Sequence, residues 1–241
     1  MTQSVQKIVS CWICGDVADS REHRIKKTDL KESFGDFSQS KPIFISTDGK
    51  LNKPAGSLKS DRLKFGKNIC RLCNGTLTQP YDLAWGSLSN ALANVIKSNP
   101  AVKTLKASKV FSLNARIEML RVHLFFLKWL GCCISEEGYS FDQEAFSLCL
   151  RMQKPHPQLF ISFGISTFPN ALGDNGIATV SDDDNRKIIR GIYFYFAGRQ
   201  IVVNVILAGL GERLIAMDGA WHPSHNTTKL TIRRPSFYES N

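Results

Sequence analysis

Two pairs of cysteines constrain this chain more than any other feature. Cys11 and Cys14 form one Cys-x-x-Cys pair, and Cys70 and Cys73 form another. Each pair can bring two thiolates to one ion, and together they supply the four sulfur ligands that zinc takes in closed structural sites. The sequence therefore predicts one structural zinc ion. Because 55 residues separate the pairs, the intervening segment must fold around the site.

The other three cysteines lie in apolar surroundings, where Cys132, Cys133 and Cys149 are expected to be small buried residues. The first ten residues lack the apolar stretch of a secretory signal, so we expect a cytoplasmic protein with free thiols. The most apolar segment, 119–134, is interrupted by charged residues. It falls short of the roughly 18 uninterrupted residues of a membrane helix, so we expect no membrane span.

The net charge of +10 is concentrated in the half of the chain that carries the cysteine pairs. Residues 1–110 hold 18 Lys and Arg against 9 Asp and Glu, whereas residues 111–241 hold 13 against 12. Lys and Arg gain free energy at phosphates because binding releases condensed counterions. We therefore expect nucleic acid as a partner, with a merely solvated basic surface as the alternative.

The apolar patterns predict an α+β chain. Helical spacing is found in segments 81–97, 114–130 and 141–152, and β-branched and aromatic residues predict strands at 41–51, 159–163, 188–196, 200–207 and 213–217. Ala197-Gly198-Arg199 is expected to form a hairpin turn and Asp182-Asp183-Asp184 a polar loop. With a basic connector at 103–109, the pattern indicates a zinc-binding domain over 1–100. A helical connector and a mostly antiparallel sheet domain follow over 110–241.

Between the cysteine pairs stands the motif Ser-Arg-Glu-His-Arg-Ile at 20–25, and Asn74 directly follows the second pair. With these motifs, roughly residues 1–95 resemble the HNH endonuclease family in its zinc-stapled, ββα-metal form. The resemblance implies a nuclease in which His23 is the general base that takes a proton from the attacking water. It implies that Glu22 and Asn74 hold a catalytic Mg²⁺ or Mn²⁺ ion, and that the substrate is DNA.

The chain departs from the family pattern in its motif residues and in the span from His23 to Cys70, which is longer than in compact members. The acidic residue, Glu22, is often Asp in the family, and Asn74 stands where a His is common. Asn68 is the nearest match to the family's middle Asn. Basic residues around the motifs are candidate phosphate contacts. They are Arg21, Arg24, Lys26, Lys27, Lys67 and Arg71, with Arg62 and Lys64 close to them in sequence.

Simpler interpretations stand beside these. Glu22 and His23 form a solvent-facing pair in one, and Asn74 caps the following helix in another. The chain as a whole could instead be a non-catalytic, zinc-stabilised nucleic-acid-binding module, or an adaptor that uses zinc only to fold. The histidines at 123, 156, 222 and 225 are expected to be packing and loop residues. The C-terminal half has no assignable chemistry and leaves room for a protein partner or an oligomer.

Overall fold

The computed structural model describes residues 9–47, 50–139, 141–166, 172–183, 186–209, 217–225 and 227–234. The helices are α1 (Lys27–Phe34), α2 (Gln79–Ser98), α3 (Ser108–Phe111), α4 (Ala115–Glu137) and α5 (Gln143–Met152). The strands are β1 (Ile43–Thr47), β2 (Lys50–Ala55), β3 (Thr104–Lys106), β4 (Leu159–Ile165), β5 (Leu172–Asp183), β6 (Arg186–Gly198), β7 (Ile201–Leu207) and β8 (Lys229–Arg233). A π-helical turn spans Leu72–Leu77.

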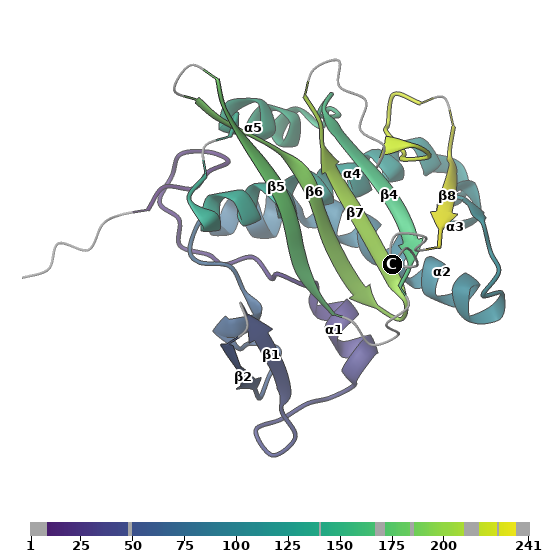
Figure 1. Cartoon of the computed structure of the whole chain (residues 1–241), viewed down its shortest axis with the longest axis horizontal. Coiled ribbons are helices and arrows are strands. Elements are labelled where there is room, and N and C mark those ends of the chain that lie inside the picture. Colours follow the sequence, from purple (N-terminus) through teal and green to yellow (C-terminus); the bar gives the residue numbers. More distant parts are fainter. Residues whose placement is uncertain are drawn as a thin grey trace, which may run out of the picture.

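The strands form two separate sheets (Figure 1). The hairpin β1–β2 stands apart, and the other six strands have the order β3-β8-β4-β7-β6-β5. Every neighbouring pair is antiparallel except β4 and β8. The predicted α+β class with a mostly antiparallel sheet is confirmed.

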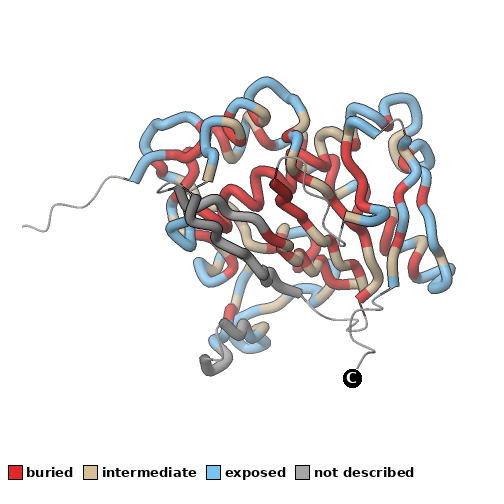
Figure 2. The backbone as a smooth tube through the Cα atoms, turned by 45° about the horizontal axis from the view of Figure 1, so that its top comes forward, coloured by how far each residue is buried: buried red, intermediate tan, exposed pale blue. Residues whose placement is uncertain are grey.

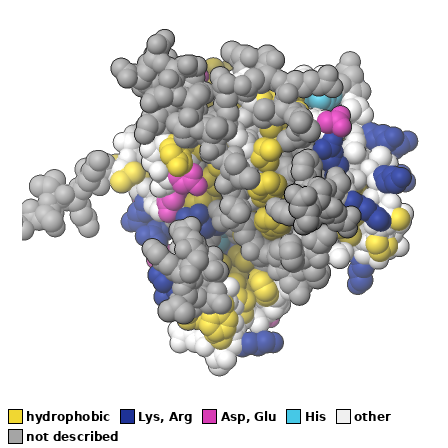
Figure 3. Space-filling view, viewed as in Figure 1, with side chains coloured by type: hydrophobic (Ala, Val, Ile, Leu, Met, Phe, Trp, Pro, Cys, Tyr) yellow, Lys and Arg dark blue, Asp and Glu magenta, His cyan; other side chains and the backbone are white. Residues whose placement is uncertain are grey.

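Helices α2 and α4 cover one face of the large sheet (Figure 1). The residues coloured as buried in Figure 2 belong largely to these helices and to the strands that they cover. Alternate strand residues point into this layer because successive side chains of a strand face opposite sides. Tyr195 is fully buried there, with its ring 5.7 Å from that of Trp85 and 5.6 Å from that of Phe126. On the opposite face, hydrophobic side chains are visible along the strands (Figure 3).

The segment that carries the first cysteine pair packs directly on α4. The Trp12 indole Nε1 lies 3.4 Å from Cys132 Sγ, and the Asn68 side chain donates to the Cys132 carbonyl at 3.0 Å. Gly131 is required here, because a Cβ atom at this position would lie 2.5 Å from the Trp12 ring. Residues from both halves of the chain, from Cys11 to Ile232, therefore share one apolar core.

The three predicted helices are present as α2, α4 and α5, and the strands predicted at 159–163, 188–196 and 200–207 are present as β4, β6 and β7. The hairpin turn lies later than predicted, since Arg199 and Gln200 have positive φ between β6 and β7. The polar loop was also misplaced, because Asp182 and Asp183 end β5. The predicted turn at 48–49 and most of the strand at 213–217 fall outside the described residues.

Five elements were not anticipated: α1, α3, β5, β8 and the short strand β3 within the expected basic connector. Strand β3 pairs with β8, so its few residues gain their hydrogen bonds from a partner more than a hundred residues away. Over the described ranges, no helix combines the length and the apolar character needed to cross a lipid bilayer.

Candidate metal centre and adjoining cavity

The four paired cysteines meet in one cluster. One sulfur atom from each of Cys11, Cys14, Cys70 and Cys73 lies within 4.8 Å of all the others, and none of the four is in a disulfide. The Sγ atoms of Cys14 and Cys70 are 3.6 Å apart, close to the ~3.8 Å that tetrahedral zinc with 2.3 Å bonds to sulfur would impose. Cys14 is exposed and the other three are buried. This cluster can hold a metal ion such as zinc.

The local backbone turns each pair toward the cluster. Gly15, with φ of 84°, donates its N–H to the Cys11 carbonyl at 2.8 Å and so closes a tight turn around the first pair. In the second pair, the Cys73 N–H points at Cys70 Sγ, 3.4 Å away. Burial raises the pKa of Cys14 to about 11 and also raises the pKa of Cys73. At Cys70, burial acts in the same direction, but hydrogen bonds with Cys73, Cys14 and Cys11 outweigh it, so the pKa of this thiol is lowered. A lowered thiol pKa favours the thiolate that a metal binds.

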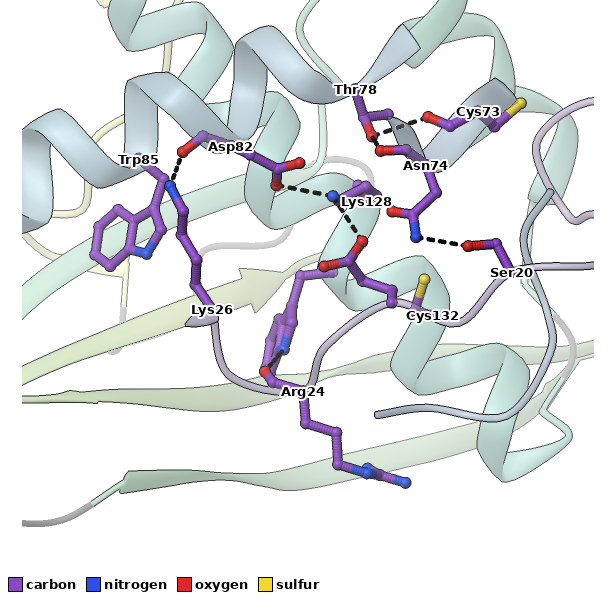
Figure 4. A network of polar contacts seen from close by, with 12 residues as sticks. Ser20, Arg24, Lys26, Cys73, Asn74, Thr78, Asp82, Trp85, Lys128 and Cys132 are labelled. Carbon is purple, nitrogen blue, oxygen red and sulfur yellow. Dashed lines mark hydrogen bonds and ion pairs between the residues drawn. The ribbon is translucent and has the colours of Figure 1, made fainter. Parts of the chain in front are cut away.

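Residues 20–24 lie antiparallel to residues 63–69, which brings the two motifs together. Ser20 pairs with Ile69 and His23 pairs with Lys64 as isolated bridges. Because Ile69 precedes the second cysteine pair, this pairing places Asn74 beside the first motif. The Asn74 amide donates to Ser20 Oγ at 3.0 Å (Figure 4) and to the Arg21 carbonyl at 3.3 Å. Asn74 therefore joins the two segments, and α2 has no side-chain cap.

A cavity of about 520 Å³ opens between these segments. Its charged residues are four cations and two carboxylates, so the net charge of its wall is positive. The lining residues are Asp19, Ser20, Arg21, His23, Lys27, Asp61, Lys64, Lys67 and Asn74. The carboxylates are already paired, Asp61 with Arg21 at 3.1 Å and Asp19 with Arg71 at 3.2 Å.

His23 is held at the cavity in a defined tautomer. Its Nε2 lies 3.1 Å from the Leu58 carbonyl oxygen, and since a carbonyl only accepts, Nε2 carries the hydrogen and Nδ1 keeps its lone pair. Burial, together with the charges of Lys27 and Lys64, lowers the pKa of His23 to about 4, against the Leu58 hydrogen bond, which raises it. At neutral pH the imidazole is uncharged, and Nδ1 is the atom that would accept a proton. A pKa of about 4 makes it a weaker base than an ordinary histidine.

Glu22 does not line this cavity. Its carboxylate lies 2.9 Å from the ammonium of Lys128, which also contacts Asp82 Oδ1 at 2.8 Å (Figure 4). Lys128 comes from the middle of α4, Asp82 comes from the first turn of α2, and the lysine side chain is 0% exposed. Burial alone would lower the pKa of Lys128, but the two carboxylates outweigh it and the pKa is raised. The ammonium is therefore charged.

The six predicted phosphate contacts divide into two groups. Arg21, Lys27 and Lys67 line the cavity, and Arg71 lies beside it through its pair with Asp19. The Lys26 ammonium instead donates to the Asp82 carbonyl (Figure 4), and Arg24 pairs with Glu136 at 3.1 Å on the far side of its segment. Asn68 does not contact His23 through its side chain, which binds the Cys132 carbonyl.

Comparison with known proteins gave no match to a family model, to a curated protein or to a solved structure. The resemblance to HNH endonucleases therefore rests on the motif residues of the sequence alone.

Two partners of the motif residues were missed from the sequence. The carbonyl of Leu58, which fixes the His23 ring, is a backbone group that any residue would supply. Lys128, which binds Glu22, did carry a signal, because it is the one charge in an apolar stretch from Val122 to Ile134 that also contains His123. A lysine in such a helix is seldom buried unless it is paired, and that rule indicates a buried carboxylate partner.

Proposed function

We propose that the cysteine cluster binds zinc as a structural ion, and that the cavity beside it binds nucleic acid and hydrolyses a phosphodiester bond. The observation that carries the catalytic part is His23, an uncharged imidazole with a free Nδ1 in a basic cavity. Four cationic side chains around it favour a phosphate. DNA is the proposed substrate, as the motif resemblance implies.

In the proposed reaction a water molecule attacks the phosphorus atom of a phosphodiester in the cavity. His23 Nδ1 takes the proton from this water as the new P–O bond forms. The bond from phosphorus to the leaving sugar oxygen breaks, and that oxygen takes a proton from solvent. Arg21, Lys64 and Lys67 stabilise the negative charge on the non-bridging oxygens. Asn74 contributes by holding Ser20 and Arg21 in place.

The resemblance also implies Mg²⁺ or Mn²⁺ between Glu22 and Asn74. Such an ion would polarise the phosphate and stabilise the leaving oxygen. The arrangement does not fit it, because the Glu22 carboxylate already binds the buried Lys128 ammonium and, unlike Asn74, does not line the cavity. No step of the proposed reaction passes through a divalent ion.

The same ion pair favours a second candidate, a nucleic-acid-binding module without catalysis. If the acidic residue of the motif serves only to neutralise Lys128, the cavity would bind phosphates through its cations and leave them intact. The two candidates share the cavity and differ only in what His23 does there.

Nicking of supercoiled plasmid separates the two candidates. Wild-type protein is compared with His23→Ala, with and without Mg²⁺ or Mn²⁺, after metal analysis shows that both retain zinc. Loss of a general base is expected to slow nicking by at least about 100-fold. The control is His225→Ala, an exposed histidine in the segment before β8, which should nick like the wild type. If wild type and His23→Ala both bind DNA and neither nicks it, the binding module is correct.

A further inference from the structure

Lys128 and the motif residue Glu22 belong to a buried ion-pair cluster. The ammonium sits between carboxylate oxygens of Glu22 and Asp82, at 2.9 and 2.8 Å, and its side chain is completely buried. The carboxylates come from segments 60 residues apart in sequence, and the lysine comes from a third segment. Charge-assisted hydrogen bonds of this length are among the stronger polar contacts in proteins.

Charge balance explains why this position does not suit a divalent ion. Glu22 and Asp82 bring two negative charges, and Lys128 brings one positive charge. The Lys26 ammonium, which donates to the Asp82 carbonyl, brings the second positive charge to the same place. A divalent ion added here would leave two positive charges uncompensated next to a buried ammonium, and burying unpaired charge is costly.

We propose that the Lys128 ammonium, held between Glu22 and Asp82, is a built-in cation that takes the position of a divalent ion at Glu22 and excludes such an ion. One consequence of this inference rests on the proposed function: hydrolysis at His23 requires no Mg²⁺ or Mn²⁺. Lys128 is a positioning residue: it does not reach the cavity, and it anchors Glu22, the chain neighbour of His23. The ion-binding claim itself concerns only the carboxylates and the lysine.

Mn²⁺ binding, followed by electron paramagnetic resonance of the free ion, tests the ion-binding claim without reference to activity. The zinc-loaded wild type is compared with Glu22→Gln, Lys128→Ala and Lys64→Ala. Lys128→Ala removes the ammonium and leaves two partly exposed carboxylates, whose side chains are 13% and 27% exposed. Lys64→Ala is the matched control, because it removes a lysine that pairs with Asp61 at 3.3 Å in the open cavity.

We expect no Mn²⁺ site in the wild type that depends on Glu22. We expect Lys128→Ala to bind one Mn²⁺ at least about tenfold more tightly than the wild type, and adding Glu22→Gln to this variant should abolish the gain. Lys64→Ala should bind Mn²⁺ as the wild type does. A wild-type site that Glu22→Gln removes would overturn the inference, and so would a folded Lys128→Ala variant with no gain.

If Lys128→Ala does not fold, the wild type and Glu22→Gln decide the question on their own, since Mn²⁺ binding that is equal in the two supports the inference. Failure of the proposed hydrolysis is recognised separately. In that case plasmid is not nicked with or without divalent ion, whereas the Mn²⁺ measurements keep the expected pattern.

Discussion

Glu22 and His23 are neighbours in the chain, yet they belong to two different regions of the molecule. His23 faces an open, basic cavity together with Asn74, whereas Glu22 points to the other side and binds Lys128 of α4. The cause is the extended backbone of residues 20–24, which pairs with residues 63–69. Successive side chains of an extended segment point to opposite sides. A Glu-His dipeptide therefore divides its two groups between a surface and an interior.

This division assigns different tasks to the two regions. In the cavity, carboxylates and cations are partly exposed, so each pair contributes little to the free energy of unfolding and remains available to a ligand. In the interior, Lys128 cannot lose a partner without leaving a buried charge. The cavity is suited to binding, and the interior ion cluster is suited to holding α4, α2 and the motif segment together.

The largest expected effect is on both regions at once, through the cysteine cluster. Cys70→Ser should lower the free energy of unfolding by on the order of 5 kcal/mol or more, because a structural zinc contributes its binding energy to folding. The expected readout is loss of one zinc per chain together with a lower thermal midpoint.

Cys149→Ser is the matched control, since Cys149 is a half-buried thiol outside the cluster. It should retain zinc. Full stability of Cys70→Ser, or retention of zinc by that variant, would show that the four cysteines do not form the metal centre.

The next largest effect is a difference in the free energy of unfolding between variants in the interior and variants in the cavity. Lys128→Met keeps the volume of the side chain and removes its charge, and it should lower the free energy of unfolding by about 3–5 kcal/mol because Glu22 and Asp82 lose their partner. Lys64→Met removes a cavity lysine that also pairs with a carboxylate, and it should cost less than about 1 kcal/mol. Urea unfolding of both variants measures the difference. Equal losses would show that the interior pair is no more important than a surface pair.

The cysteine cluster could be predicted from the sequence because its information is local. Two ligands three residues apart are brought together by a single turn, so spacing alone indicates their convergence. The helices α2 and α4 and the strands β6 and β7 were found for the same reason, since their periodicity is a property of short windows. Strand β3 was missed because its three residues are defined by pairing with β8.

The candidate site could be predicted only in part. The proximity of His23 and Asn74 depends on the pairing of residues 20–24 with 63–69. The motif resemblance implied one site for Glu22, His23 and Asn74, and of these three His23 and Asn74 line the cavity. The direction of Glu22 depends on Lys128, which is 106 residues away in sequence. Sequence alone offered one hint, a charged residue in an apolar helix, but nothing in that hint identifies which carboxylate it meets.

Acid should lower the free energy of unfolding through His23, which lies in the cavity. Because burial lowers the pKa of His23 from 6.5 to about 4, the unfolded chain takes up a proton below pH 6.5 that the folded chain does not. The stability that belongs to His23 is therefore present above pH 6.5 and is lost as the pH falls toward 4. Between pH 6.5 and 5 the loss is about 2 kcal/mol.

His23→Gln removes the titrating group and keeps a donor for the Leu58 carbonyl. Its free energy of unfolding should fall less steeply than that of the wild type over the same interval, with zinc content checked at each pH. Identical pH profiles for the two proteins would mean that His23 titrates in the folded state as it does in the unfolded chain.

The smallest expected effect concerns two lysines that the sequence treats alike. Lys26 and Lys67 are both predicted phosphate contacts, but Lys67 is exposed at the cavity, whereas Lys26 donates to the Asp82 carbonyl in the interior. Each phosphate contact to duplex DNA contributes about 0.9 to the slope of log affinity against log salt. Lys67→Met should therefore reduce that slope by about one, and Lys26→Met should leave it unchanged while lowering stability. A slope reduced equally by both variants would place DNA on both sides of the motif segment and remove the division between cavity and interior.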